Sequence, residues 1–231
     1  MDTRTPVKAL TFDLFGTILD LGGSLTPYMA EFLQAKGSDV DPDTFWAQCR
    51  ARQRIEQYQD SMTMIGHSGY LEVARKAFVY CLKLNNVPFT AEDSHEFMQA
   101  WQYLSPFPEV VAALERLKTR YRLVILSNGE PDFLAHLAQN RVQWPFDDIF
   151  SVNTVGFFKP HPSVYRRAAT SIGLEVGECL MVSANSFDVM GARACGYRAA
   201  YVNRYTLPYE DSVYQPDVTV TDFTELAEAL L

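Results

Sequence analysis

The chain has 231 residues, a length that allows one large domain or a core domain with a smaller companion. It is 48% hydrophobic and 21% charged, as expected for a soluble globular protein, and its formal net charge is −8. No basic run or stripe interrupts this negative balance, so we expect no nucleic acid partner.

The sequence also argues against membranes, disulfides and a histidine-based metal site. No apolar run approaches the roughly 20 residues that a membrane span requires, and the N-terminus lacks the apolar core of a signal peptide. The four cysteines and the four histidines show none of the close, paired spacings of zinc ligands or of a disulfide framework. We therefore predict reduced thiols, a cytoplasmic location and no membrane association.

The first predicted element is a buried strand that carries Asp13 at its tip. The apolar run at residues 9–12 ends at this acid, and Gly16 and Thr17 then turn the chain. Such a run is typical of a parallel strand in an open α/β sheet, where ligands bind at the carboxyl ends of the strands. The residue two positions after Asp13 is Phe15 and not a second acidic residue.

A helical block follows the strand and is broken at Gly37, Gly66 and Val87-Pro88. Apolar residues recur at three- and four-residue spacing in four segments, which predicts helices near 24–36, 43–60, 68–86 and 91–103. No strand-like run interrupts them. The block therefore predicts an inserted helical cap domain at residues 21–103.

Strands and helices alternate again from residue 104 onward. Apolar runs predict strands at 122–126, 149–152, 179–182, 199–202 and 218–220. Helices are predicted near 107–119, 162–172 and 222–230, and two more begin at 130–132 and near 187. Parallel strands joined by helices form right-handed crossovers. The predicted fold class is therefore α/β, with a doubly wound parallel sheet formed by residues 1–20 and 104–231.

Polar residues recur where these strands end. Because the carboxyl ends of parallel strands converge on one crevice, we expect these side chains to meet in space. They are Asp13 and Thr17, Ser127 and Asn128, then Ser183, Asn185 and Asp188, with Lys159 on the loop between two of these elements.

Four motifs resemble those of the haloacid dehalogenase (HAD) superfamily of hydrolases, and they follow one another in the same order along the chain. They read Asp13-Leu-Phe-Gly-Thr17, Leu126-Ser-Asn-Gly129, Lys159-Pro160 and Ser183-Ala-Asn-Ser-Phe-Asp188. The resemblance covers essentially the whole core. It implies a Rossmann-like core, and a helical cap between the first and second motifs.

Two positions separate the branches of that superfamily. Magnesium-dependent phosphatases carry acids at the places of Phe15 and Ser183, and Mg²⁺ prefers such carboxylate ligands. The L-2-haloacid dehalogenase (type II) branch resembles this chain instead, with DxFGT or DxYGT at the first motif and SSNxxDxxGA at the fourth. Ala184 departs from that pattern at one serine. This resemblance implies no metal and no cofactor.

The chemistry of a carbon–halogen bond suits these residues. Asp13 can displace the halide and form an ester, which water then hydrolyses. Lys159 would keep Asp13 ionised, and Asp188 would either hold Lys159 or assist activation of the water. The predicted remaining contacts are Asn185 for water or substrate, hydroxyl or backbone donors from Thr17, Ser127 and Ser183, and, from the resemblance, Asn128 and Tyr165.

The resemblance also implies a substrate-binding arginine on the first cap helix, but the register is ambiguous. Arg50 keeps the family spacing to Gln53, whereas Arg52 keeps the spacing to Tyr58. Both stay candidates. For the halide, we expect an aromatic environment from Phe187, with Tyr58 and Tyr70 from the cap.

The leading prediction is a metal-independent hydrolytic dehalogenase of short 2-haloacids, a range that can include haloacetates, with an ester intermediate on Asp13. One alternative is a HAD-like phosphatase or another hydrolase of a small metabolite. Another alternative is a binding protein that keeps the fold but has no catalytic activity. The candidate nucleophile Asp13 argues against it, because a binding protein has no need of a buried nucleophile. The resemblance also makes a homodimer one possible assembly.

Overall fold

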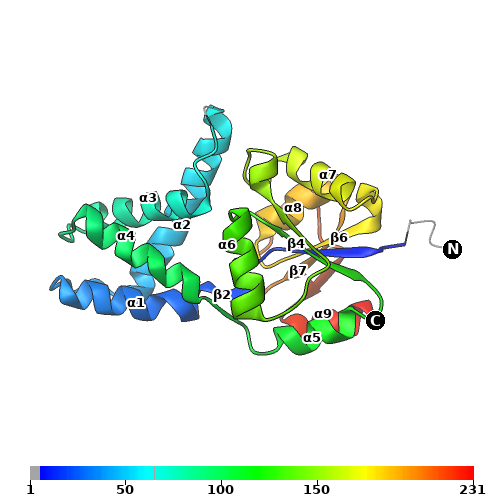
Figure 1. The fold of residues 1–231 in the computed structure, drawn as a ribbon, viewed down its shortest axis with the longest axis horizontal. Coiled ribbons are helices and arrows are strands. Elements are labelled where there is room, and N and C mark those ends of the chain that lie inside the picture. The colour runs from blue at the N-terminus through cyan, green and yellow to red at the C-terminus, as the bar shows by residue number, and fades with distance from the viewer. Residues whose placement is uncertain (1–5, 65) are drawn as a thin grey trace.

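In a computed structural model, the chain forms a six-stranded parallel sheet next to a bundle of helices (Figure 1). The structure describes residues 6–64 and 66–231. From edge to edge, the sheet contains β5 (Asp148–Ser151), β4 (Arg122–Ser127), β1 (Ala9–Phe12), β6 (Cys179–Ser183), β7 (Arg198–Val202) and β8 (Val218–Val220).

Helices cover both faces of this sheet. In Figure 1, α5 (Val110–Leu117) and α9 (Phe223–Leu230) lie below it, while α7 (Pro162–Ser171) and α8 (Ser186–Ala194) lie above it. The short helix α6 (Pro131–His136) follows β4. This arrangement confirms the predicted α/β class, the doubly wound parallel sheet and the helical insertion.

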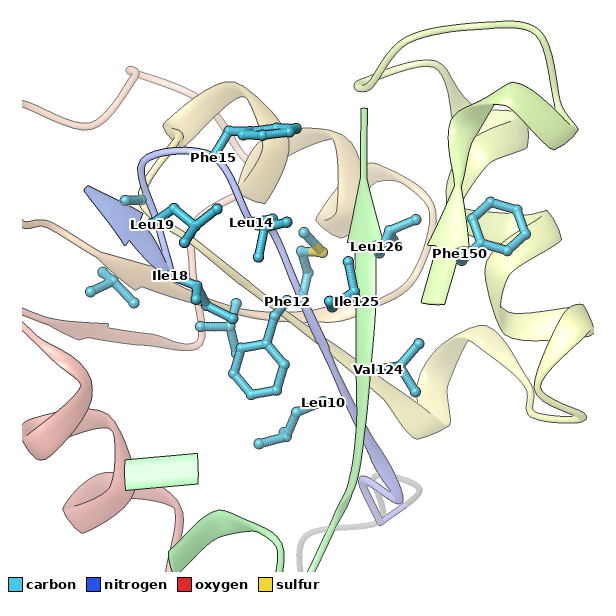
Figure 2. Close-up of a cluster of buried hydrophobic side chains, with 14 of the residues drawn as sticks. Leu10, Phe12, Leu14, Phe15, Ile18, Leu19, Val124, Ile125, Leu126 and Phe150 are labelled. Carbon is cyan, nitrogen blue, oxygen red and sulfur yellow. The ribbon is translucent and has the colours of Figure 1, made fainter. Parts of the chain in front are cut away.

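The central strand β1 is the most enclosed part of the sheet. It pairs with β4 on one side and β6 on the other, so that Phe12 is level with Ile125 and Val182. Phe12 is fully buried among the apolar side chains of the sheet (Figure 2), and its ring lies 5.8 Å from that of Phe223. This packing fixes the height at which the next residue, Asp13, leaves the sheet.

The inserted block, called the cap helices below, consists of α1 (Leu21–Ala35), α2 (Pro42–Thr63), α3 (Tyr70–Leu84) and α4 (Ala91–Gln99), followed by a 3₁₀ turn, η1 (Ala100–Tyr103). Helix α1 begins three residues before the predicted 24, because the side chain of Asp20 accepts a hydrogen bond from the Gly23 amide and caps it. Asp41 caps α2 in the same way.

The cap helices have an apolar cluster of their own. It contains Met29, Phe45, Phe78 and Phe97, and the rings of Phe78 and Phe97 stack at 4.1 Å. At the junction with the sheet, the ring of Phe15 stacks on that of Tyr70, with centroids 4.0 Å apart. Figure 2 shows Phe15 beyond the end of β1, on the turn that leads toward the cap helices.

Two features were absent from the prediction. The strands β2 (Leu19–Asp20) and β3 (Ser105–Pro106) form a short antiparallel ladder where the chain leaves for the cap helices and returns from them. Residues Leu137–Val142 form a π-helical extension of α6. Two-residue strands and single π turns are too short to produce a periodic sequence signal. Within the described residues, no helix is both long and apolar enough to cross a membrane.

Candidate active site

Asp13 is held at the end of β1 by the turn that follows it. Gly16 adopts a φ of +83°, which favours glycine, and this turn brings Thr17 back toward the carboxylate. Thr17 Oγ1 donates to Asp13 Oδ2 at 2.8 Å and accepts from the Ala184 amide at 2.9 Å. Thr17 is fully buried and does not line the small pocket over Asp13, called the reaction pocket below. Its side chain therefore positions Asp13 and does not face that pocket.

Lys159 lies between two carboxylates. Its Nζ donates to Asp13 Oδ1 at 2.9 Å, to Asp188 Oδ2 at 2.7 Å and to the Leu126 carbonyl at 2.9 Å, which uses all three of its donors. Burial favours the neutral amine, but the charges of Asp13 and Asp188 outweigh it and hold the pKa of Lys159 above its ordinary value. The amine therefore stays protonated beside Asp13.

Asp188 and Tyr165 lie behind this lysine. Tyr165 Oη donates to Asp188 Oδ1 at 2.7 Å, and both side chains are fully buried. Burial, together with the charge of Asp188, raises the pKa of Tyr165 well above its ordinary value, so it remains a donor. Tyr165 was expected to contact substrate, but the structure does not bring it to the pocket wall, and its hydroxyl contacts Asp188 instead.

Asn185 connects the fourth motif to the nucleophile. Its Nδ2 donates to Asp13 Oδ2 at 2.9 Å. Ser183 Oγ accepts from the backbone amide of Asn185 at 3.1 Å and shapes the turn that presents it. Ser183 is fully buried and outside the pocket wall, so the expectation of a direct catalytic contact from its side chain is corrected to a positioning role.

A small pocket of about 20 Å³ lies over Asp13, between the strand ends and the cap helices. This volume has room for about one water molecule. The lining residues are Asp13, Phe15, Arg50, Arg54, Gln57, Tyr70, Asn128, Lys159, Asn185 and Phe187.

Helix α2 separates the candidate arginines. Its buried stripe includes Gln53 and Gln57, and Arg50 and Arg54 flank this stripe on the side facing the pocket. Arg52 lies on the other flank, where its Nε donates to Glu56 at 2.8 Å and its guanidinium stacks on Tyr80 at 4.1 Å. Of the two candidates, Arg50 therefore lines the pocket and Arg52 does not.

Among the pocket residues that the sequence prediction missed, Arg54 is the charged one. Its Nη2 donates to Asn185 Oδ1 at 3.2 Å, and its guanidinium lies 5.3 Å from the Phe187 ring. Its buried Nε has no hydrogen-bond partner among the described residues. Burial and the nearby charge of Arg50 lower the pKa of Arg54. The signal that could have found it is the four-residue spacing from Arg50, which places both on one helix face.

The structure brings only some of the aromatic residues expected around the halide into the pocket wall. Phe187 and Tyr70 line the pocket, while Tyr58 lies outside the pocket wall and packs edge-on against Phe187 at 6.2 Å. Asn128 also lines the pocket, and its Oδ1 accepts from the Lys159 amide at 2.9 Å. Ser127 is fully buried, and its Oγ has no partner in the described part of the chain.

Comparison with known proteins places this geometry in a family. The chain belongs to the haloacid dehalogenase-like hydrolases, since the model of that family matches residues 7–196. Haloacetate dehalogenase H-2 of Moraxella sp. (strain B) is 29% identical over 217 residues, which span 93% of each chain. The (S)-2-haloacid dehalogenase of Xanthobacter autotrophicus is 31% identical over 200 residues, or 86% of this chain and 76% of that one.

A solved structure shows the same likeness in three dimensions. The L-2-haloacid dehalogenase from Xanthobacter autotrophicus with chloropropionic acid covalently bound superposes with a TM-score of 0.81 at 26% identity. The alignment covers 96% of this chain and 97% of that chain, so it includes both the sheet and the cap helices.

Proposed function

We propose that this hydrolase converts short 2-haloacids, including haloacetates, to 2-hydroxy acids through an ester on Asp13, without a metal ion. The observation that carries the proposal is the position of Lys159, whose Nζ bonds both Asp13 and Asp188. The printed names of the relatives, a haloacetate dehalogenase and a 2-haloacid dehalogenase, agree with it.

The first step is an in-line displacement at C2 of the substrate. One Asp13 oxygen forms a bond to C2 while the carbon–halogen bond breaks, and the halide leaves with the bonding pair. This step requires no proton, which suits a site with Phe15 where an acid catalyst would stand. Thr17 and Asn185, both donors to Asp13 Oδ2, fix the carboxylate in position for attack.

The second step is hydrolysis of the ester. Water adds to the carboxyl carbon of Asp13, the bond from that carbon to the substrate oxygen breaks, and Asp13 is regenerated. Overall, one water is consumed and one halide and one proton are released. Lys159 stabilises the negative charge that develops on the Asp13 oxygens. Of the two roles considered for Asp188, we propose that it holds Lys159, because both of its oxygens already accept hydrogen bonds.

The two arginines of α2 supply the charge that the substrate needs. Lys159 has no free donor, so Arg50 and Arg54 are the pocket cations that can receive the carboxylate and the departing halide. An anion between two adjacent guanidinium groups is favoured electrostatically. Asn128, which lines the pocket, is a further candidate for the carboxylate, whereas Ser127 is fully buried outside the pocket wall.

A magnesium ion does not fit the residues present. Lys159 Nζ already occupies the position between the carboxylates of Asp13 and Asp188, and Ser183 stands where a third acid would bind metal. Among residues 6–64 and 66–231, no group of three or more His, Cys, Asp or Glu side chains is arranged to hold a metal ion. These contacts also disfavour a phosphatase, since a phosphate dianion beside Asp13 would be repelled without a metal.

The test is halide release in the presence of EDTA. We expect the purified protein to release bromide from 2-bromopropanoate and bromoacetate, and EDTA to leave both rates unchanged. Magnesium-dependent turnover of p-nitrophenyl phosphate without halide release would contradict the proposal and favour the phosphatase alternative.

Three further proposals concern the whole molecule. We assign residues 1–20 and 104–231 to a core domain and 21–103 to a cap domain, with residues 1–5 and 65 outside the described part of the chain. The separate apolar cluster of the cap helices supports this division. We also propose a cytoplasmic location and a homodimer. Cell fractionation and sedimentation analysis, respectively, test these two.

A further inference from the structure

A second cavity adjoins the reaction pocket. Its volume is about 270 Å³, more than ten times that of the pocket over Asp13. The two share Arg50, Arg54 and Asn185, so the arginines of α2 form the wall between them. The mechanism described above makes no use of this outer cavity.

The outer cavity is mainly apolar beyond the arginines. Leu21, Trp46, Ala47, Tyr205 and Leu207 contribute to its lining. Leu207 and Tyr205 are 52% and 47% exposed, respectively, which is high for large apolar side chains beside a site. A hydrocarbon group placed there would remove apolar surface from water, and such burial is favourable in proportion to the area removed.

Arg50 and Arg54 contact different side chains. Arg50 lies 5.6 Å from the Trp46 ring and donates to Gln53 Oε1 at 2.6 Å. Arg54 is held by Phe187 and Asn185 on its side of the pocket. Arg50 and Arg54 line both spaces, so a ligand at Asp13 that extends between these two side chains reaches the outer cavity.

We propose that the outer cavity is a subsite for the carbon chain of 2-haloacids whose C2 substituent is apolar and longer than a methyl group. This inference rests on the proposed function. The outer cavity offers apolar walls directly behind the cations that hold the acid, in a volume more than ten times that of the pocket over Asp13. The carboxylate and halide stay at the arginines, and the chain lies past them.

The experiment compares two substrates that carry the same halogen. Racemic 2-bromopropanoate and 2-bromohexanoate are turned over by the wild type, by Ala47→Phe and by Ala51→Phe, and bromide release is measured. Ala47 lines the outer cavity, so phenylalanine there fills it. Ala51 is exposed one helical turn along α2 and does not line the cavity, so Ala51→Phe is the matched control.

We expect the ratio of kcat/KM for 2-bromohexanoate to kcat/KM for 2-bromopropanoate to fall about tenfold in Ala47→Phe. A fully buried methylene contributes a factor of roughly four, so half burial of the three additional methylenes contributes about eightfold. The same ratio should stay within about twofold of wild type in Ala51→Phe. A ratio unchanged in Ala47→Phe overturns the subsite, as does release of bromide from 2-bromopropanoate alone. Release from neither substrate overturns the proposed function and this inference together.

A binding measurement separates the cavity from the chemistry. Calorimetric titration with propanoate and hexanoate, which carry no halogen, should show hexanoate binding about tenfold more tightly to the wild type. That preference should be lost in Ala47→Phe and kept in Ala51→Phe. Equal affinity of the wild type for the two acids would contradict the subsite, whatever the outcome of the halide assays.

Discussion

The two sides of the reaction pocket differ in how their charges are satisfied. On the core side, buried Lys159 donates hydrogen bonds to both Asp13 and Asp188, which are buried as well. On α2, Arg54 keeps a buried Nε without a partner among the described residues. We infer from this contrast that the side chains on the core side are already in position before substrate arrives. On the cap side, an incoming anion can accept hydrogen bonds from donors that lack a partner.

The largest effect expected from this difference is on the core side. Asp13→Asn removes the nucleophile while keeping its shape, so we expect kcat for 2-bromopropanoate to fall roughly 10⁴-fold or more. Bromide release under saturating substrate measures it. Asp132→Asn, an exposed acid in the first turn of α6, is the matched control and should retain activity. Comparable activity in Asp13→Asn would show that no ester forms on this residue.

Lys159 tests whether the core charges depend on each other for stability. Lys159→Met leaves two carboxylates buried without their cation, and we expect a loss of about 3–5 kcal/mol in the free energy of unfolding in urea. Lys118 forms an ion pair with Asp147 at the surface, so Lys118→Met should cost less than about 1 kcal/mol. Equal losses in the two variants would remove the distinction between buried and exposed pairs.

The cap side should respond through substrate binding. Arg54→Leu removes donors that we assign to the substrate anions, so kcat/KM should fall roughly 10- to 100-fold, the value of hydrogen bonds to a charged group. Arg52→Leu should change kcat/KM by less than about twofold, because it breaks a surface helix pair. A larger effect at Arg52 than at Arg54 would mean that α2 presents its other flank to the substrate.

The raised pKa of Lys159 gives a smaller effect that depends on pH. Below about pH 10.5 the lysine is protonated in both the folded and the unfolded chain, so its contribution to stability is constant. As the pH rises further, the unfolded chain loses the proton first and stability falls. We expect urea unfolding between about pH 10 and 12 to show a steeper decline for the wild type than for Lys159→Met. Parallel declines would contradict the assigned pKa.

The sequence predicted the core side of the pocket better than the cap side, for a physical reason. A buried parallel strand is a continuous apolar run, and its end is marked where a polar residue such as Asp13 appears. The end of a strand therefore places a side chain at the sheet edge without further information.

A helix face gives weaker placement. Arg50, Arg52 and Arg54 all lie on α2, and the choice between them depends on which flank of the buried stripe meets the core. That orientation is set by tertiary packing, such as the stacking of Phe15 on Tyr70. Tyr165 is a similar case, since the resemblance puts it near the site but does not reveal that it faces Asp188 from behind.

The central claim, an ester on Asp13, is tested most directly by a single turnover in water labelled with heavy oxygen, with enzyme in excess over 2-bromopropanoate. Water attacks the carboxyl carbon of Asp13 in this account, so the first product should carry unlabelled oxygen and the label should appear in the peptide that contains Asp13. Heavy oxygen in the hydroxyl group of the first product, with an unlabelled Asp13 peptide, would show direct attack of water on C2 and contradict it.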